Sequence, residues 1–212
     1  MSTLAALSVS DFSAALASDA PAPGGGSASA AAGAAGAGLL AMVVRLTLGK
    51  EKFRDAWAEL EPLAATLDTH RVRLLELVDE DTRAYDAIVA ARKLPKGTDA
   101  EKAARQGAID AATVVATTVP MQTAFYAEQA LRRAETVAAR GNPNAASDAW
   151  VAALLLAAAV EGALANVRIN LPGIVDEELK RGFAEDAADL GKKEAAALEA
   201  ARALARTRGL TV

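Results

Sequence analysis

The apolar residues of the chain recur with the period of an α-helix, and no alternating strand pattern of useful length is present. Glycines, prolines and capping residues mark where one helix ends and the next begins. The predicted helical segments are residues 11–17, 27–48, 50–93, 98–140, 145–170 and a charged amphipathic segment that ends near Gly209. The pattern therefore predicts an all-α fold, a single-domain bundle of about five to seven helices over residues 1–212.

Several helix boundaries carry a specific signal. Ser10 is the expected N-cap of the first helix, and Thr98 with Glu101 forms the pattern of a capping box. Proline lacks a backbone N–H, so Pro62 is expected to interrupt the long third segment or to open a new helix there. For the same reason Pro120 is expected to bend the fourth segment.

Residues 27–48 differ from the other segments because they are small or apolar on every side of the helix. A helix of that kind is typically buried all round. The composition agrees, since 52% of the chain is hydrophobic but only 4% is aromatic, and Ala, Leu and Val supply most of the apolar mass. Such side chains fill space only where backbones approach closely, which favours packed helices over a β-sandwich or barrel.

Charge and cysteine content narrow the classes of function. The formal net charge is −4, which argues against a nucleic-acid partner because phosphate binding needs a basic surface. The absence of Cys excludes thiolate catalysis, cysteine-bound zinc and a disulfide framework. The single His excludes a metal site built from several histidines.

The chain gives no clear membrane signal. Its N-terminal residues lack the basic region of a signal peptide. Two apolar stretches, residues 28–44 and 149–160, resemble membrane spans at first sight. The first consists mainly of weakly hydrophobic Ala, Gly and Ser, and the second reaches Glu161 before the about 20 residues that a bilayer requires. We therefore expect a soluble cytoplasmic protein with no membrane partner.

The first candidate site is the loop Pro21–Ser27, which reads Pro-Ala-Pro-Gly-Gly-Gly-Ser. Its glycines Gly24, Gly25 and Gly26 allow the backbone to approach a ligand, and the following helix offers free N–H groups to an anion or a carbonyl. The loop is not a Walker A motif, because no Gly-Lys-Ser/Thr follows, and no strand precedes it as in a dinucleotide-binding loop. A flexible connection between two helices is the alternative.

The second candidate is one face of the predicted helix 145–170. On a helical wheel its members fall within roughly 80° of one another; they are Asn144, Asp148, Ala152, Leu155, Ala159, Gly162, Asn166 and Asn170. This stripe is polar at both ends and mostly small in the middle, so it can receive a planar ligand whose edge pairs with the amides. The alternative is helix–helix packing, with Asn144 and Asp148 as caps.

The third candidate is the face shared by Asp81, Tyr85 and Arg92. A carboxylate beside a tyrosine hydroxyl can act as a general base or hold a cationic substrate. The neighbouring acidic residues Asp79 and Glu80 leave a solvated charged face as the alternative.

Basic residues suggest an anion site, although each alone is typical of a solvent-facing side chain. Arg45, Lys50 and Lys52 lie around the end of the apolar helix, and Lys96 lies in a predicted turn. Together they can bind the carboxylates of a small anionic substrate. His70 is expected at the surface rather than in a site.

These motifs, in this order, resemble the formiminotransferase-cyclodeaminase and methenyltetrahydrofolate cyclohydrolase family. The matching stretches are, in chain order, residues 21–27, 46–50, 81 with 84–86, 94–96, 98–105, 141–148 and 166–170. The resemblance runs from about Phe12 to the last helix, and the order of the motifs is more specific than any one of them. Ala22 and Trp150 depart from it, because we expect threonine and a smaller residue there.

The resemblance implies an all-helical homodimer that acts on one-carbon derivatives of tetrahydrofolate with neither a metal nor another cofactor. Family members either hydrolyse 5,10-methenyltetrahydrofolate to 10-formyltetrahydrofolate or close formiminotetrahydrofolate to the methenyl form with loss of ammonia. The stand-alone length and the Leu-Pro-Lys-Gly-Thr-Asp-Ala-Glu-Lys-Ala-Ala-Arg run favour the cyclohydrolase. The alternatives are cyclodeaminase activity and a folate-binding helical module without turnover.

The resemblance also suggests roles for individual residues. Asp81 and Asp148 are expected to hold the methenyl cation or to transfer a proton, with Tyr85 as a relay. Lys50 or Lys96 is expected to stabilise the oxyanion or to bind the glutamate tail. The residues expected to bind the folate are Pro23, Gly24, Gly25, Gly26, Ser27, Lys96, Asn142, Asn144, Asn166 and Asn170.

Overall fold

The computed structural model describes residues 3–212, and no strand occurs in that range. Its α-helices are α1 (Val9–Leu16), α2 (Gly25–Leu48), α3 (Arg54–Arg92), α4 (Asp99–Leu131), α5 (Ala134–Arg140), α6 (Ala146–Asn170) and α7 (Glu177–Thr207). Single turns of 3-10 helix are η1 (Leu4–Ala6), η2 (Glu51–Phe53), η3 (Pro143–Ala145) and η4 (Leu171–Gly173). The all-α prediction is confirmed.

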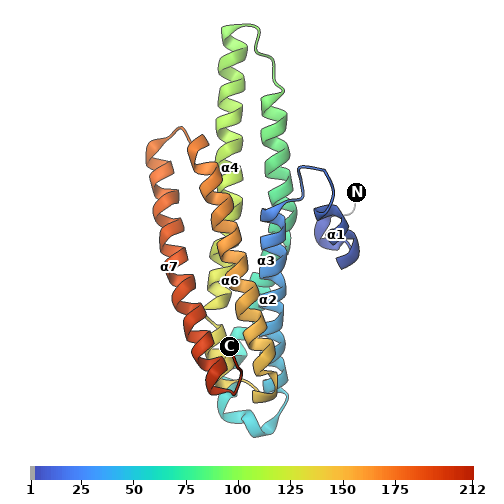
Figure 1. Cartoon of the computed structure of the whole chain (residues 1–212), viewed down its shortest axis with the longest axis vertical. Helices are drawn as coiled ribbons and strands as arrows, with labels where there is room; N and C mark the ends of the chain where they lie inside the picture. Colours follow the sequence, from blue (N-terminus) through green and yellow to red (C-terminus); the bar gives the residue numbers. More distant parts are fainter. Residues whose placement is uncertain (1–2) are drawn as a thin grey trace.

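The long helices form an elongated bundle (Figure 1). α2 packs against α3 and α6, α4 packs against the same two helices, and α7 lies along α6 and α4. The turn between α3 and α4 projects beyond the other helices at one end, and α1 lies beside the bundle near the start of α2 (Figure 1). The buried apolar side chains of these helices form a connected core.

Close contact between α2 and α6 explains the Ala- and Gly-rich sequence of α2. A Cβ atom at Gly36 would lie 2.7 Å from Cγ of Leu156 and 2.9 Å from the carbonyl oxygen of Ala152, so no side chain fits there. Ala152 and Ala159 of the predicted polar stripe are fully buried. The middle of that stripe is therefore helix–helix packing, as the alternative interpretation held.

The prediction that α2 is buried all round is wrong. Helices α3, α6 and, to a smaller extent, α4 pack against α2, but one side stays open, where Ala35 and Leu46 are exposed. Val151 and Leu154 are exposed on the adjoining helix α6. These four residues mark an uncovered apolar surface, which we call the α2/α6 face.

Both internal prolines lie within continuous helices, so Pro62 neither interrupts the third segment nor opens a new helix. That Pro120 bends its helix stays a prediction. Pro62 lies inside α3 and Pro120 inside α4. Pro62 leaves the carbonyl of Ala58 without its helical donor, but Ala58 is exposed, so water can satisfy that carbonyl. The predicted fourth segment breaks at residues 132–133 instead, between α4 and α5.

The N-terminal caps are partly as predicted. Thr98 and Glu101 form the expected capping box at the start of α4. The N-cap of α1 is Ser8 rather than Ser10, because α1 begins at Val9 and the Ser8 side chain accepts a hydrogen bond from the backbone N–H of Asp11. The cap therefore lies two residues earlier than the sequence suggests.

His70 is buried, so its predicted surface location is wrong. It shares a helical face of α3 with Leu67 and Leu74, which are fully buried. Its ring packs edge-on against the ring of Tyr126 on α4, with 5.7 Å between centroids. The apolar periodicity of α3 was a better guide to its location than its polar neighbours in sequence.

Two helical segments have the length and hydropathy of membrane spans, namely Gly25–Leu48 and Pro143–Gly173. Half of the most apolar window of each is buried within the bundle. Core helices of soluble proteins have the same properties. That the chain does not span a membrane stays a prediction.

Close packing at Gly36 gives a prediction about stability. Gly36→Ala forces a methyl group onto Leu156 and Ala152, so we expect the free energy of unfolding to fall by about 1–3 kcal/mol. Gly107→Ala is the matched control, because a Cβ atom there meets nothing within 4 Å. That variant should be more stable by about 0.5–1 kcal/mol, since alanine favours the helix. Urea unfolding followed by circular dichroism measures both, and equal stability of the two variants would contradict the packing argument.

Candidate functional site

A cavity of about 250 Å³ lies at the start of α2. The loop before α2 forms one wall, α3 and α6 form two others, and one residue of α4 contributes. The lining residues are Pro21, Ala22, Gly24, Gly25, Gly26, Asp81, Ala84, Tyr85, Ile88, Ala116, Asn166, Ile169 and Asn170. The glycine loop, the Asp81 face of α3 and the C-terminal end of the α6 stripe therefore meet at one place.

Asp81 links α3 to the first turn of α2. Its Oδ2 atom accepts hydrogen bonds from the backbone N–H of Ser27 at 2.9 Å and from the Ser27 hydroxyl at 3.0 Å. The single proton of that hydroxyl is shared with the carbonyl oxygen of Val78, at 2.9 Å. The N–H groups of a first helical turn have no partner within the helix, and the N-cap of α2, Gly24, has no side chain to supply one. Asp81 therefore caps α2 from a neighbouring helix.

Gly26 makes this contact possible. A Cβ atom at that position would lie 2.1 Å from Oδ1 of Asp81, far inside contact distance. The lack of a side chain in the glycine loop thus allows the Asp81 carboxylate, as well as a ligand, to approach the α2 backbone.

Burial raises the pKa of Asp81 above its ordinary value. The two hydrogen bonds from Ser27 oppose that effect, because they favour the ionised carboxylate. A raised pKa together with a position in a cavity is typical of a carboxylate that exchanges protons with a substrate.

Two amides from α6 complete the polar part of the cavity. Nδ2 of Asn166 donates to the carbonyl oxygen of Gly162 at 2.8 Å. Nδ2 of Asn170 donates to the carbonyl oxygen of Ala116, on α4, also at 2.8 Å. Each amide nitrogen is therefore engaged with the protein.

The remaining wall is apolar and was mostly missed by the sequence analysis. Ile88 lies two turns beyond Asp81 on the same face of α3, so the helical wheel contained a signal for it. Ala116 comes from α4, and only the packing of the helices brings it here. Tyr85 lines the cavity with a partly exposed side chain.

Two further predicted folate-binding residues lie next to the cavity. Ser27 is fully buried beneath Asp81 and does not line the cavity. Pro23 belongs to the loop that forms the wall and follows a cis peptide bond with Ala22. These positions fit support of the site better than contact with a ligand.

A second group of predicted site residues lies at the other end of α2. Asn142 donates its backbone N–H to Oγ1 of Thr47 at 2.9 Å, and its side chain accepts from the backbone N–H of Asn144 at 3.2 Å. Lys50 follows α2, and Asp148 lies in the first turn of α6. The 24 residues of α2 span about 36 Å at 1.5 Å per residue, so one chain does not bring this group to the cavity.

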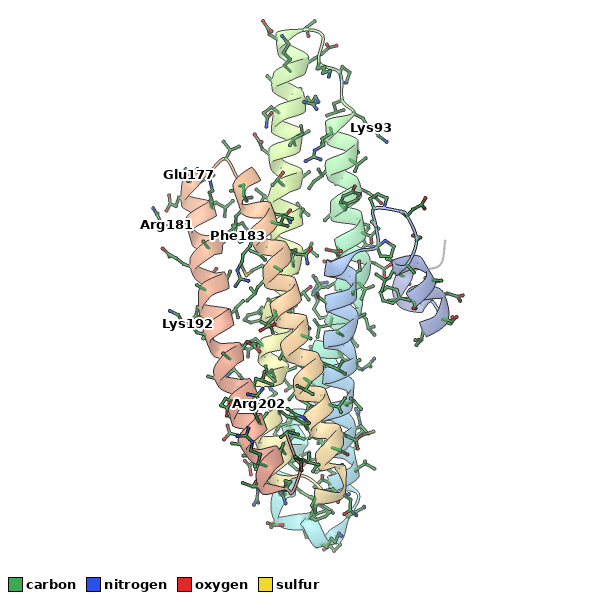
Figure 2. The ribbon with its side chains drawn as sticks, viewed as in Figure 1. Lys93, Glu177, Arg181, Phe183, Lys192 and Arg202 are labelled. Atoms are coloured by element: carbon green, nitrogen blue, oxygen red, sulfur yellow. The ribbon has the colours of Figure 1, made fainter. Side chains whose placement is uncertain are left out.

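Lys96 and Trp150 also lie away from the cavity. Lys96 is exposed in the projecting turn, three residues beyond the labelled Lys93 (Figure 2). Trp150 packs beneath the Arg202 guanidinium of α7, with 5.8 Å to the ring centroid. Arg202 lies towards the end of α7 that is remote from the α3–α4 turn (Figure 2), so the bulk of Trp150 does not shape the cavity.

A larger groove, of about 640 Å³, lies between α3 and α4. Alanine, valine and leucine side chains line it almost entirely, and Glu80 and Arg83 are its polar residues. Within residues 3–212 no group of three or more His, Asp or Glu side chains is arranged to bind a metal ion. Of these two, the smaller cavity is the one in which polar groups converge on an enclosed space, which is the usual form of a ligand site.

Comparison with known proteins identifies the family of the chain. Residues 8–189 match the model of the formiminotransferase-cyclodeaminase family. The chain is 41% identical over 178 residues to the methenyltetrahydrofolate cyclohydrolase of Methylorubrum extorquens, and the match covers 84% of each protein. It is 34% identical over 142 residues to the formimidoyltransferase-cyclodeaminase of Sus scrofa, covering 67% of this chain and 26% of that protein.

A solved structure extends the comparison. The crystal structure of formiminotetrahydrofolate cyclodeaminase from Thermotoga maritima matches with a TM-score of 0.87 and 26% sequence identity. The match covers 97% of this chain and 98% of that chain. The resemblance seen in the sequence is thereby confirmed: this chain belongs to the formiminotransferase-cyclodeaminase family.

Proposed function

We propose that this protein hydrolyses 5,10-methenyltetrahydrofolate to 10-formyltetrahydrofolate. The observation that carries the proposal is the half-buried carboxylate of Asp81 in a cavity beneath the glycine loop. The methenyl bridge is a delocalised cation, which such a carboxylate attracts. The 41% identity to a methenyltetrahydrofolate cyclohydrolase supports the same substrate.

Asp81 has a defined part in this reaction. The oxygen of water bonds to the methenyl carbon while Asp81 accepts one of its protons. The bond between that carbon and N5 then breaks, N5 is protonated, and the carbinol hydroxyl loses its proton to become the formyl oxygen on N10. One proton leaves to solvent, so charge and atoms balance. The methenyl carbon is already electrophilic, and the proposed reaction needs water and a proton carrier but no metal or organic cofactor.

Cyclodeaminase activity is the second candidate, supported by the structural likeness to the Thermotoga maritima enzyme. In that reaction N10 attacks the formimino carbon, ammonia leaves, and the methenyl cation forms. Both reactions pass through a tetrahedral carbon between the same two nitrogens. The same carboxylate serves either, so only turnover of the two substrates separates them.

We also propose that the protein is a homodimer joined through the α2/α6 face. An uncovered apolar surface of this kind is typical of a protein interface. A two-fold axis across the middle of α2 pairs each end of the helix with the opposite end of its copy. That arrangement brings the Lys50, Asn142 and Asp148 group of one copy beside the Asp81 cavity of the other.

The proposed role of Asp81 predicts how its substitution changes activity. The wild-type protein should remove the near-ultraviolet absorbance of 5,10-methenyltetrahydrofolate, and Asp81→Asn should lower kcat/KM by about 10²–10⁴-fold because it removes the proton acceptor. Asp86→Asn is the control, an exposed carboxylate on the same helix, and should retain wild-type activity. Near-wild-type activity in Asp81→Asn would refute the assignment. Methenyl absorbance that appears only from formiminotetrahydrofolate would establish the cyclodeaminase instead.

The second prediction concerns pH. Asp81 must be ionised to accept a proton, so kcat/KM should fall as the pH is lowered through its raised pKa. The hydroxyl of Ser27 lowers that pKa. Ser27→Ala removes this effect, the pKa rises further, and the acid limb of the pH profile should move to higher pH. A limb that stays in place or moves to lower pH would show that another group controls it.

The third prediction tests the dimer. Light scattering should give twice the chain mass of 21.6 kDa, and Leu154→Glu should give the monomer because it places a charge in the apolar interface. Val72→Glu is the control, since Val72 is equally exposed but lies on α3. A monomeric wild-type protein, or a dimeric Leu154→Glu variant, would contradict the proposed interface.

A further inference from the structure

The amide groups in the cavity have a fixed polarity. Asn166 and Asn170 each donate from Nδ2 to a carbonyl oxygen of the protein. A carbonyl oxygen only accepts, so the amide nitrogen must face it and the amide oxygen faces away. Both residues line the cavity. Each amide keeps its oxygen as an acceptor for a ligand, together with the second N–H of Nδ2.

Pro120 is the reason that Asn170 has this orientation. In a regular helix the carbonyl of Ala116 would accept from the backbone N–H of residue 120, but proline has none. Pro120 lies inside α4, and both Pro120 and Ala116 are buried, so the freed carbonyl needs a partner within the protein. The partner is Asn170, at 2.8 Å. A proline on one helix thus orients a cavity side chain on another.

Asp81 adds a third acceptor. Ser27 donates to its Oδ2 atom. The Oδ1 atom lies where it leaves no room for a Cβ atom at Gly26, at 2.1 Å. The side chains that line the cavity therefore present carboxylate and amide oxygens as acceptors, beside the second amide N–H groups and the Tyr85 hydroxyl. A ligand edge that carries hydrogen-bond donors is complementary to those oxygens.

We propose that Asn170 and Asn166 determine substrate specificity by accepting hydrogen bonds from the donor edge of a reduced pterin. That edge consists of the exocyclic 2-amino group and the ring N–H. Pro120 is the positioning residue that fixes the orientation of the Asn170 amide. The inference rests on the proposed function, because it takes the substrate to be a tetrahydrofolate. It adds which edge of the ring faces α6. The cationic bridge then lies on the Asp81 side of the cavity.

A change in the ligand paired with changes in the protein tests this directly. The two substrates are 5,10-methenyltetrahydrofolate and its 2-desamino-2-methyl analogue, in which the donor amine is replaced by a methyl group. The quantity measured is the ratio of their kcat/KM values. A wild-type site that accepts from the amine should prefer the natural substrate by about 10²-fold or more, because the analogue leaves a buried acceptor unpaired.

The protein variants are Asn170→Ala, Asn166→Ala and Pro120→Ala, with Ile88→Ala as a control from the apolar wall of the same cavity. Asn170→Ala and Asn166→Ala each remove one acceptor. Their combined effect should be to reduce the ratio of the two kcat/KM values by about tenfold or more. Pro120→Ala restores an N–H to the Ala116 carbonyl, releases the Asn170 amide to rotate, and should also reduce the ratio. Ile88→Ala should change activity on both substrates but not their ratio.

A merely structural role for these residues predicts a different result. Loss of packing would lower kcat/KM for both substrates equally and leave the ratio unchanged, so an unchanged ratio in both asparagine variants overturns the proposal. A wild-type ratio near one overturns it as well. Thermal unfolding of Pro120→Ala shows whether the bundle of this variant is intact. If it is not, the two asparagine variants alone decide the test. Absence of turnover of the natural substrate by the wild type would instead overturn the proposed function.

Discussion

The hydrogen bonds from Ser27 to Asp81 are the interaction on which the site depends. They satisfy a backbone N–H at the start of α2, hold a carboxylate inside the protein, and require a residue without a side chain at position 26. A buried carboxylate without such partners would be costly, and its proton would be held more tightly. The same contact therefore stabilises the fold and keeps Asp81 within reach of its ionised form.

Close packing of α2 on α6 places the other half of the cavity. Because Gly36 has no side chain, the two helices approach within contact of their backbones, and the last turn of α6 reaches the first turn of α2. Asn166 and Asn170 then stand opposite Asp81. The alanine- and glycine-rich composition, which at first indicates only packed helices, is thus the physical reason that amides and carboxylate share one enclosed space.

Helical periodicity and capping signals were sufficient to predict the all-α bundle, the capping box at Thr98 and the shared face of Asp81 and Tyr85. They were insufficient where the outcome depends on a neighbouring helix. Pro120 alone does not reveal that a side chain from α6 satisfies the carbonyl that it leaves free. Asp148 suggested a second carboxylate in the same site, because one helical stripe does not say which end faces the glycine loop. The uncovered side of α2 was missed for the same reason.

The most direct test of the account is to locate the bound ligand. A crystal structure of the protein with 5-formyltetrahydrofolate should show the reduced pterin between the glycine loop, Asp81 and the two amides of α6. Its 2-amino edge should face Asn170, and its N5 side should face Asp81. Density for the ring in the apolar groove between α3 and α4, or at the far end of α2 away from any Asp81 cavity, would contradict the central claim that the carboxylate capping α2 is the catalytic group.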